Sequence, residues 1–260
     1  MSTLLYAVEG AVATITLNRP QVLNALDEPM IMRLREACEQ ARGDSSVRAI
    51  VLAGNGPAFM AGGDVTLFHA HLSRLPQIVE RLARELHFAI LALRRAPKPV
   101  IAAVHGACAG AGVSLVAAAD LAIAADDAQF MLAYSKLGTS PDGGSTYFLP
   151  RLLGSRKALE LMLLSEAFDA ATALSFGLVN RVVPSSDLAA GTHALAHRLA
   201  QGPTFAYAQT KRLVESSFEH SIETQLEAET QAFARCAGTA DLAEGVRAFV
   251  GKRKPAFGGT

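Results

Sequence analysis

The stretch PVIAAVHGACAGAGVSLVAAA, residues 99–119, decides between two very different folds. It runs 21 residues without Asp, Glu, Lys or Arg, which is long enough to cross a bilayer, and Gly106 and Gly110 form a GxxxG pair. Membrane insertion is driven mainly by Leu, Ile, Phe and Val, whereas this stretch consists largely of Ala and Gly. It begins with β-branched residues, breaks at His105-Gly106 and then becomes helix-like. We therefore predict a buried strand, a loop and a helix here instead of a membrane span.

The chain around this stretch alternates between strand and helix patterns. Apolar residues at helical spacing predict helices, and short continuous apolar runs predict buried strands. The predicted order is strands 4–8 and 12–17, a helix from Asp27 to Gly43, strand 48–54, helix 76–95, strand 99–104, a helix from about 110, and strands near 121–125 and 129–133. Such alternation implies right-handed crossovers and a mainly parallel sheet, so the predicted fold class is α/β.

Strand patterns disappear after Pro184. Four helical segments follow, at 186–201, 203–217, 221–236 and 239–250. We therefore predict two domains, an α/β core over 1–185 and a helical region over 186–260.

Composition restricts the class of protein. The 260 residues include 24 basic and 24 acidic side chains and no dense basic cluster, which argues against nucleic acid and anionic membranes as partners. Three cysteines lie far apart without a CxxC pair, as expected of reduced thiols, and the N-terminus lacks the pattern of a signal peptide. We expect a cytoplasmic protein.

Two glycine-rich loops, GNGPAFMAGGDV (54–65) and HGACAGAGVS (105–114), each follow a buried strand. Ligands of open α/β sheets bind beyond the carboxyl ends of the strands, where glycine lets the backbone approach closely. Three other uses of such residues do not fit. The glycine pattern of dinucleotide-binding loops is not met, because Leu115 stands at its third glycine position. The sequence contains no GKS or GKT phosphate-binding loop, and Ser114 is not followed by the second glycine of a nucleophile elbow. His69 and His71 have no further clustered ligands, so we expect no metal site.

The stretch LGTSPDGGSTYFLPRLLG (137–154) contains one carboxylate, Asp142. Pro-Asp-Gly is common in surface turns, which would explain the acid without any chemistry. A catalytic acid or base held over a pocket would explain it equally. The spacing alone leaves both interpretations open.

The chain resembles the crotonase, or enoyl-CoA hydratase/isomerase, superfamily over nearly its whole length. The resemblance lies in several segments in the expected order: LNRPQVLNAL (17–26), FMAGGDV (59–65), KPVIAAVHGACAGAG (98–112), DLAIAADDAQF (120–130), the PDGG loop, LPRLLG and FGLVNRVVP (176–184). It implies a spiral of ββα units with a C-terminal helical trimerisation region, and a homotrimer or hexamer. It also implies an acyl-CoA thioester as substrate and partner. No separate cofactor is expected, since coenzyme A is part of that substrate.

The resemblance also implies a set of site residues. The backbone amides of Gly63 and Ala111 would form an oxyanion hole for the thioester oxygen, each donor being worth roughly 3–4 kcal/mol. The other substrate-binding positions it implies are Val22, Ala25, Ala61, Gly62, Asp64, Val65, Gly110, Tyr134 and Pro141, of which Val22, Ala25, Ala61, Asp64 and Val65 would lie near the nucleotide part of CoA.

The sequence departs from the hydratase pattern at both glutamates that would hold the attacking water. Their positions are occupied by Ser114 and Tyr134, which cannot easily replace two carboxylates as acid and base. Asp142 instead lies in a loop similar to that of family members that shift a double bond, including the phenylacetyl-CoA-type isomerases. An apolar pocket would make its carboxylate a better proton acceptor. We therefore expect an enoyl-CoA isomerase in which Asp142 takes and returns the proton.

Three alternatives remain open. The chain could be an unconventional enoyl-CoA hydratase. It could also be a CoA-thioester dehalogenase or hydrolase in which Asp142 is the nucleophile and His87 a base, although Gly63 and Tyr134 stand where dehalogenases of the family carry an aromatic and a tryptophan. His87 would otherwise be a helix-packing residue. The third alternative is a non-catalytic binder of CoA thioesters or of RNA, and the balanced charge argues against RNA.

Overall fold

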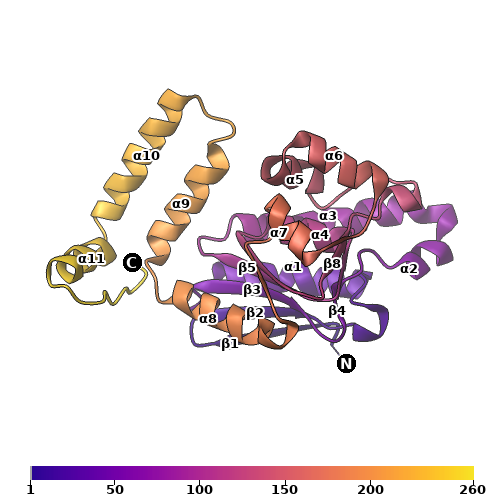
Figure 1. Ribbon diagram of the computed structural model, residues 1–260, viewed down its shortest axis with the longest axis horizontal. Coiled ribbons are helices and arrows are strands. Elements are labelled where there is room, and N and C mark those ends of the chain that lie inside the picture. The colour runs from indigo at the N-terminus through magenta and orange to yellow at the C-terminus, as the bar shows by residue number, and fades with distance from the viewer. Residues whose placement is uncertain (1) are drawn as a thin grey trace.

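The computed structural model describes residues 2–260 and contains two sheets, which lie beneath and between helices (Figure 1). The larger sheet has six strands in the order β1-β2-β3-β5-β7-β10. Strands β1 and β2 pair antiparallel, and the other neighbouring strands pair parallel, which confirms the predicted mainly parallel sheet. Their bounds are β1 Leu4–Glu9, β2 Val12–Leu17, β3 Ala49–Gly54, β5 Val100–Val104, β7 Leu121–Ala125 and β10 Arg181–Val183.

A smaller sheet of four short strands is arranged in the order β4-β6-β8-β9. These are β4 Ala58–Met60, β6 Ala107–Ala109, β8 Gln129–Met131 and β9 Phe168–Asp169. Strands β4, β6 and β8 each follow one strand of the larger sheet and precede a helix, so the chain repeats a ββα unit as expected. The predicted strand 129–133 is shorter than expected, and β4 and β6 were not predicted because they are three-residue strands within the two glycine-rich loops.

Seven helices belong to the units before β10. They are α1 Glu28–Gly43, α2 Val65–Ala70, α3 Leu75–Arg94, α4 Ala111–Ala118, α5 Ser145–Leu153, α6 Ser155–Leu164 and α7 Ala170–Phe176. Helix α1 begins as predicted at Asp27, whose side chain accepts a hydrogen bond of 2.9 Å from the amide of Met30. It packs against α3 over one face of the larger sheet, where alternate residues of β3, Ile50 and Leu52, are buried.

The four C-terminal helices predicted from the sequence are all present. They are α8 Leu188–Ala200, α9 Thr204–Ser216, α10 Ile222–Ala237 and α11 Ala240–Val250. Helix α8 covers the other face of the larger sheet, since Ala196 and Ala200 pack with Ala49 and Val51 of β3. Helices α9 to α11 project away from the two sheets (Figure 1).

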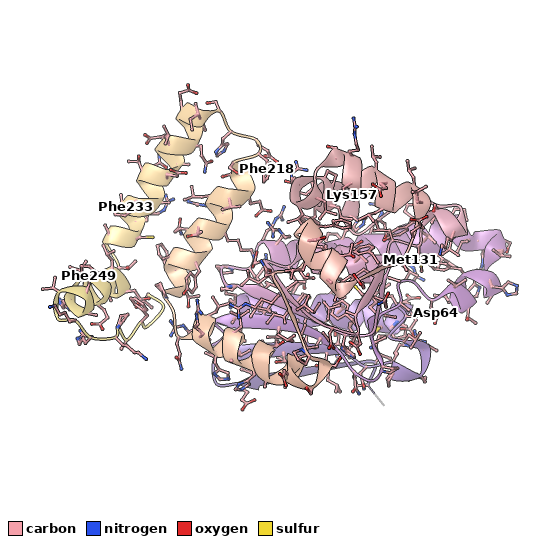
Figure 2. The ribbon with its side chains drawn as sticks, viewed as in Figure 1. Asp64, Met131, Lys157, Phe218, Phe233 and Phe249 are labelled. Carbon is pink, nitrogen blue, oxygen red and sulfur yellow. The ribbon has the colours of Figure 1, made fainter. Side chains whose placement is uncertain are left out.

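The projecting helices expose large apolar side chains. Phe233 and Phe249, which lie on α10 and α11 (Figure 2), are 72% and 86% exposed, and Phe218, at the turn after α9, is 57% exposed. Exposed aromatic side chains that gather on one part of a monomer are typical of contact surfaces. The role of residues 186–260 in trimer formation therefore stays a prediction, with this exposure in its favour.

The stretch 99–119 forms the predicted buried strand, loop and helix, and the loop also contains the short strand β6. It forms buried strand β5, then β6, then the short helix α4, all of whose residues are buried. Within residues 2–260, no helix is both long and apolar enough to cross a membrane.

Candidate active site

A cavity of about 430 Å³ opens where the two glycine-rich loops meet the segment 132–142. One wall is apolar and comes from α3, with Leu75, Val79 and Leu82 among its residues. Eight predicted site residues line this cavity: Ala61, Gly62, Gly63, Val65, Gly110, Ala111, Tyr134 and Asp142. Residues that are distant in the sequence therefore surround one space.

The two glycine-rich loops contact each other because the small sheet pairs β4 with β6. Gly62 has φ +94°, and a Cβ on it would lie 3.2 Å from the carbonyl oxygen of Ala109, so glycine is required for this close approach. The next residue, Gly63, and Ala111, the first residue of α4, both line the cavity. Neither amide donates to an acceptor within residues 2–260, so both N–H groups are available to a ligand.

Asp142 holds its carboxylate against Tyr134. The Tyr134 hydroxyl donates to Oδ1 of Asp142 over 2.6 Å, and the carboxylate accepts no hydrogen bond from the amides of its own turn among the described residues. The turn is instead closed by the Asp142 carbonyl, which accepts from the amide of Ser145 at 3.2 Å and from the hydroxyls of Ser145 at 2.9 Å and Ser114 at 3.0 Å. The side chain of Asp142 is therefore not needed to close the turn.

The residue after Asp142 fixes the loop on the helices around it. Gly143 has φ +61°, and a Cβ there would lie 2.8 Å from the Cβ of Ser114, which excludes other residues. Its amide donates to Nε2 of His87 on α3 over 3.2 Å. This nitrogen is therefore an acceptor, the imidazole proton is on Nδ1, and His87 does not line the cavity. The geometry supports a role for His87 in holding the loop, which sequence analysis did not foresee, over a role as a base on the substrate.

Charge in the cavity is sparse. Among the described residues that line it, Asp142 is the only acid and Lys136 the only permanent cation. Burial raises the pKa of Tyr134, and the negative charge of Asp142 raises it further, so the phenol stays protonated and remains a hydrogen-bond donor. The site thus contains one carboxylate, one neutral phenol and two available amides.

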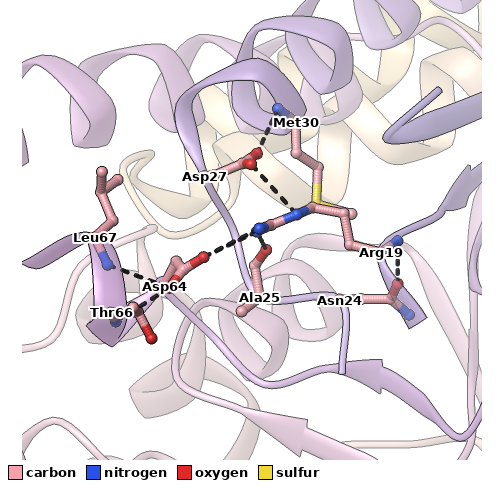
Figure 3. A network of polar contacts seen from close by, with 8 residues as sticks. All are labelled: Arg19, Asn24, Ala25, Asp27, Met30, Asp64, Thr66 and Leu67. Carbon is pink, nitrogen blue, oxygen red and sulfur yellow. Dashed lines mark hydrogen bonds and ion pairs between the residues drawn. The ribbon is translucent and has the colours of Figure 1, made fainter. Parts of the chain in front are cut away.

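Two of the predicted site residues, Asp64 and Ala25, do not line the cavity but form hydrogen bonds beside it. Asp64 caps α2 by accepting from the amides of Thr66 at 3.1 Å and Leu67 at 3.3 Å (Figure 3). Its other oxygen accepts from both terminal nitrogens of Arg19 at 3.1 Å, and Arg19 also donates to the Ala25 carbonyl. Asp64 and Ala25 are therefore engaged inside the protein, and we had not singled out Arg19, which ties the two segments together.

Val22 and Pro141 also lie outside the cavity lining. Val22 is 38% exposed beside the first glycine-rich loop, to which its segment is tied by hydrogen bonds from Leu26 N to Gly62 O and from Ala61 N to Leu23 O. Their contact with a ligand stays a prediction. Phe68 and the α3 wall were not predicted as site residues, although the apolar face of the predicted helix 76–95 was a usable signal.

A second cavity, of about 470 Å³, lies between α9 and the α/β core. Four of the charged residues that line it pair with one another, since Lys211 donates to Asp120 over 2.7 Å and Arg94 contacts both Asp120 at 3.3 Å and Glu215 at 3.7 Å. The fifth, Arg151, donates to the Tyr147 carbonyl and lies over the Tyr147 ring. Neither glycine-rich loop reaches it. We therefore place the candidate active site in the first cavity. Within residues 2–260, no group of three or more His, Cys, Asp or Glu residues is arranged to hold a metal ion.

Known proteins match this chain over nearly its whole length. A family model described as enoyl-CoA hydratase/isomerase matches residues 7–260. A protein of Escherichia coli named 1,2-epoxyphenylacetyl-CoA isomerase is 38% identical over 261 residues, which cover 100% of this chain and 99% of that protein. A protein of Rhodobacter capsulatus named "Probable enoyl-CoA hydratase" is 39% identical over 257 residues, with 99% and 98% of the two chains covered.

Solved structures show the same fold. The crystal structure of an enoyl-CoA hydratase from a Polaromonas species superposes with a TM-score of 0.93 at 35% identity and covers 98% of this chain and 99% of that one. The relatives thus carry both hydratase and isomerase names, and the names alone do not choose between the two reactions.

Proposed function

This chain belongs to the enoyl-CoA hydratase/isomerase family, whose members act on CoA thioesters, and we propose that it is an enoyl-CoA isomerase that moves a carbon–carbon double bond within its substrate. The proposal rests on which ionisable side chains line the cavity. Asp142 is its only acid among the described residues, and Ser114 and Tyr134 occupy the two positions where the resemblance places the hydratase glutamates.

The proposed reaction needs one base that becomes an acid. Asp142 takes a proton from carbon, and the electrons of the broken C–H bond move through the conjugated system onto the thioester oxygen. The protonated carboxyl group then returns the proton to another carbon while the double bond is rebuilt at its new place. Hydration would need a second group to activate water, and no second carboxylate among the described residues lines the cavity.

The enolate oxygen would lie between the amides of Gly63 and Ala111. Both residues line the cavity, and neither amide has an acceptor within residues 2–260; Ala111 also begins α4, whose N-terminus carries partial positive charge. The apolar α3 wall favours an acyl chain over water beside the reacting carbons. Val22, Ala61 and Val65, near the rim, are the contacts that we propose for CoA. No cofactor other than the CoA of the substrate enters this scheme.

One experiment separates the family's reactions. The protein is incubated with a panel of enoyl-CoA thioesters in deuterated water enriched in oxygen-18, and the products are weighed by mass spectrometry. Isomerisation predicts a shifted double bond without oxygen-18, with deuterium gain to the extent that the proton on Asp142 exchanges with solvent before it returns to carbon. Oxygen-18 on the β-carbon would mean hydration, and free CoA would mean thioester hydrolysis, and either result as the main product would overturn the proposal.

A further inference from the structure

Tyr134 and Ser114 form one cluster with Asp142. Besides the bond of 2.6 Å from Tyr134 to Oδ1, the Ser114 hydroxyl lies 3.0 Å from the Asp142 carbonyl oxygen and 3.3 Å from the Tyr134 hydroxyl. Ser114 is fully buried on α4, and Tyr134 precedes the short 3-10 turn Ser135–Leu137. Tyr134 therefore contacts the carboxylate of Asp142, and Ser114 contacts its backbone carbonyl.

The backbone around Tyr134 is fixed by several interactions. Its carbonyl accepts from the amides of Leu137 at 3.0 Å and Thr139 at 3.2 Å, and its own amide donates to Leu132 at 2.7 Å. The preceding residue, Ala133, has φ +57°, a left-handed conformation that is costly for a residue with a Cβ. The fold maintains a strained residue immediately before Tyr134, which indicates that the direction of this side chain matters.

The bond from Tyr134 distinguishes the two carboxylate oxygens. Oδ1 accepts the phenol, and among residues 2–260 no side chain or amide donates to Oδ2. Because the phenol stays protonated in its buried place beside a negative charge, it acts as a donor and does not compete as a base.

We propose that Tyr134 is a positioning residue for Asp142, which holds Oδ1 so that Oδ2 is the atom that takes the substrate proton and returns it. Tyr134 keeps its own proton throughout, and Ser114 fixes the loop by donating to the Asp142 carbonyl. This inference rests on the proposed isomerase function and assigns a role that differs from the substrate contact the sequence implied for Tyr134.

The test is Tyr134→Phe, which removes one oxygen atom and leaves the ring. Because a hydrogen bond to a charged group is lost, we expect kcat to fall by roughly 10- to 100-fold. The affinity for an unreactive acyl-CoA should change less than about twofold, since the ring wall of the cavity is retained. Tyr6→Phe is the matched control, because the buried Tyr6 hydroxyl has no partner within residues 2–260 and lies on β1.

A double-mutant cycle with Asp142→Asn separates this inference from the proposed function. If Tyr134 acts through Asp142, the variant with both changes should be no slower than Asp142→Asn alone. A further loss in the double variant would overturn the inference, as would a Tyr134→Phe enzyme that binds acyl-CoA more weakly but keeps kcat. Near-normal isomerisation by Asp142→Asn would instead overturn the proposed function itself, whatever Tyr134→Phe does.

Discussion

Tyr134 donates a hydrogen bond of 2.6 Å to Oδ1 of Asp142, eight positions further along the chain, and both residues line the same cavity. The Pro-Asp-Gly sequence alone is compatible with either a plain surface turn or a catalytic carboxylate. The turn is closed by the backbone carbonyl of Asp142, whereas its carboxylate is held by a side chain from another part of the loop. Asp142 therefore occupies a turn without capping it, which leaves its carboxylate for chemistry.

The oxyanion hole can be tested at Ala111 with little structural change. Ala111→Pro removes the amide donor at the first position of α4, where proline is well tolerated because this N–H has no helical partner. We expect turnover to fall by about 10²–10³-fold with a melting temperature close to that of the parent. Ala111→Gly keeps the amide and serves as the control. Normal turnover in a folded Ala111→Pro enzyme would remove this amide from the mechanism.

His87 should matter through its acceptor nitrogen. His87→Leu leaves the Gly143 amide without its partner, and one neutral hydrogen bond corresponds to a loss of roughly 2- to 12-fold in kcat through a less ordered loop. His87→Gln keeps an acceptor and should lose less. Steady-state kinetics of the two variants check this. If His87→Leu were as inactive as Asp142→Asn, His87 would be a catalytic base, as in the dehalogenase alternative.

The pKa of Tyr134 predicts how stability depends on alkaline pH. Burial raises the pKa of the phenol above its ordinary value of 10.0, so the folded protein retains this proton after the unfolded chain has released it. The stabilisation is complete below pH 10 and is lost as pH rises above it, by up to about 1.4 kcal/mol per pH unit. Urea unfolding at pH 9 and pH 11 should therefore show a smaller loss for Tyr134→Phe than for the parent. Equal losses in the two proteins would contradict this account.

The exposed aromatic residues of the projecting helices should be buried between subunits. Phe249 is 86% exposed on α11, so Phe249→Asp should hardly change the folding of one chain but should shift a trimer or hexamer towards monomers. Sedimentation velocity measures this. Leu5→Lys, on exposed edge strand β1, is the control and should leave the assembly unchanged. An unaltered assembly in Phe249→Asp would place the interface elsewhere.

Local patterns in the sequence predicted the C-terminal helices and every strand of the larger sheet except β10. Continuous apolar runs identified β3 and β5, and helical spacing identified α1 and α8 to α11, because each of these elements buries one regular face. Strands β4 and β6 were not predicted, because a three-residue strand is too short to show an alternating pattern and the two strands that pair are about fifty residues apart in the sequence. Helices α5 to α7 were not predicted either. For α5 the reason is local, since it follows two glycines with positive φ, has no side-chain cap and contains Pro150.

The candidate site was accessible from the sequence only in part. The two glycine-rich loops could be found by their position after buried strands, but the individual amides of Gly63 and Ala111 followed only from the resemblance. The Tyr134 side chain that contacts Asp142 follows a left-handed residue, Ala133, and the bond between His87 and Gly143 joins α3 to a loop 56 residues away. Neither leaves a local signal, because side-chain contacts across loops are set by tertiary packing.

The most direct test of the central claim is the rate of isomerisation and deuterium exchange by Asp142→Asn. Asparagine keeps the size of the side chain and an oxygen that can accept from Tyr134, but it cannot take a proton. We predict a folded variant with parent-like affinity for acyl-CoA that isomerises about 10²–10⁴ times more slowly, with deuterium exchange into the thioester reduced to the same extent. Near-normal turnover and exchange on a substrate that the parent isomerises would show that Asp142 is only a turn residue and would contradict the mechanism.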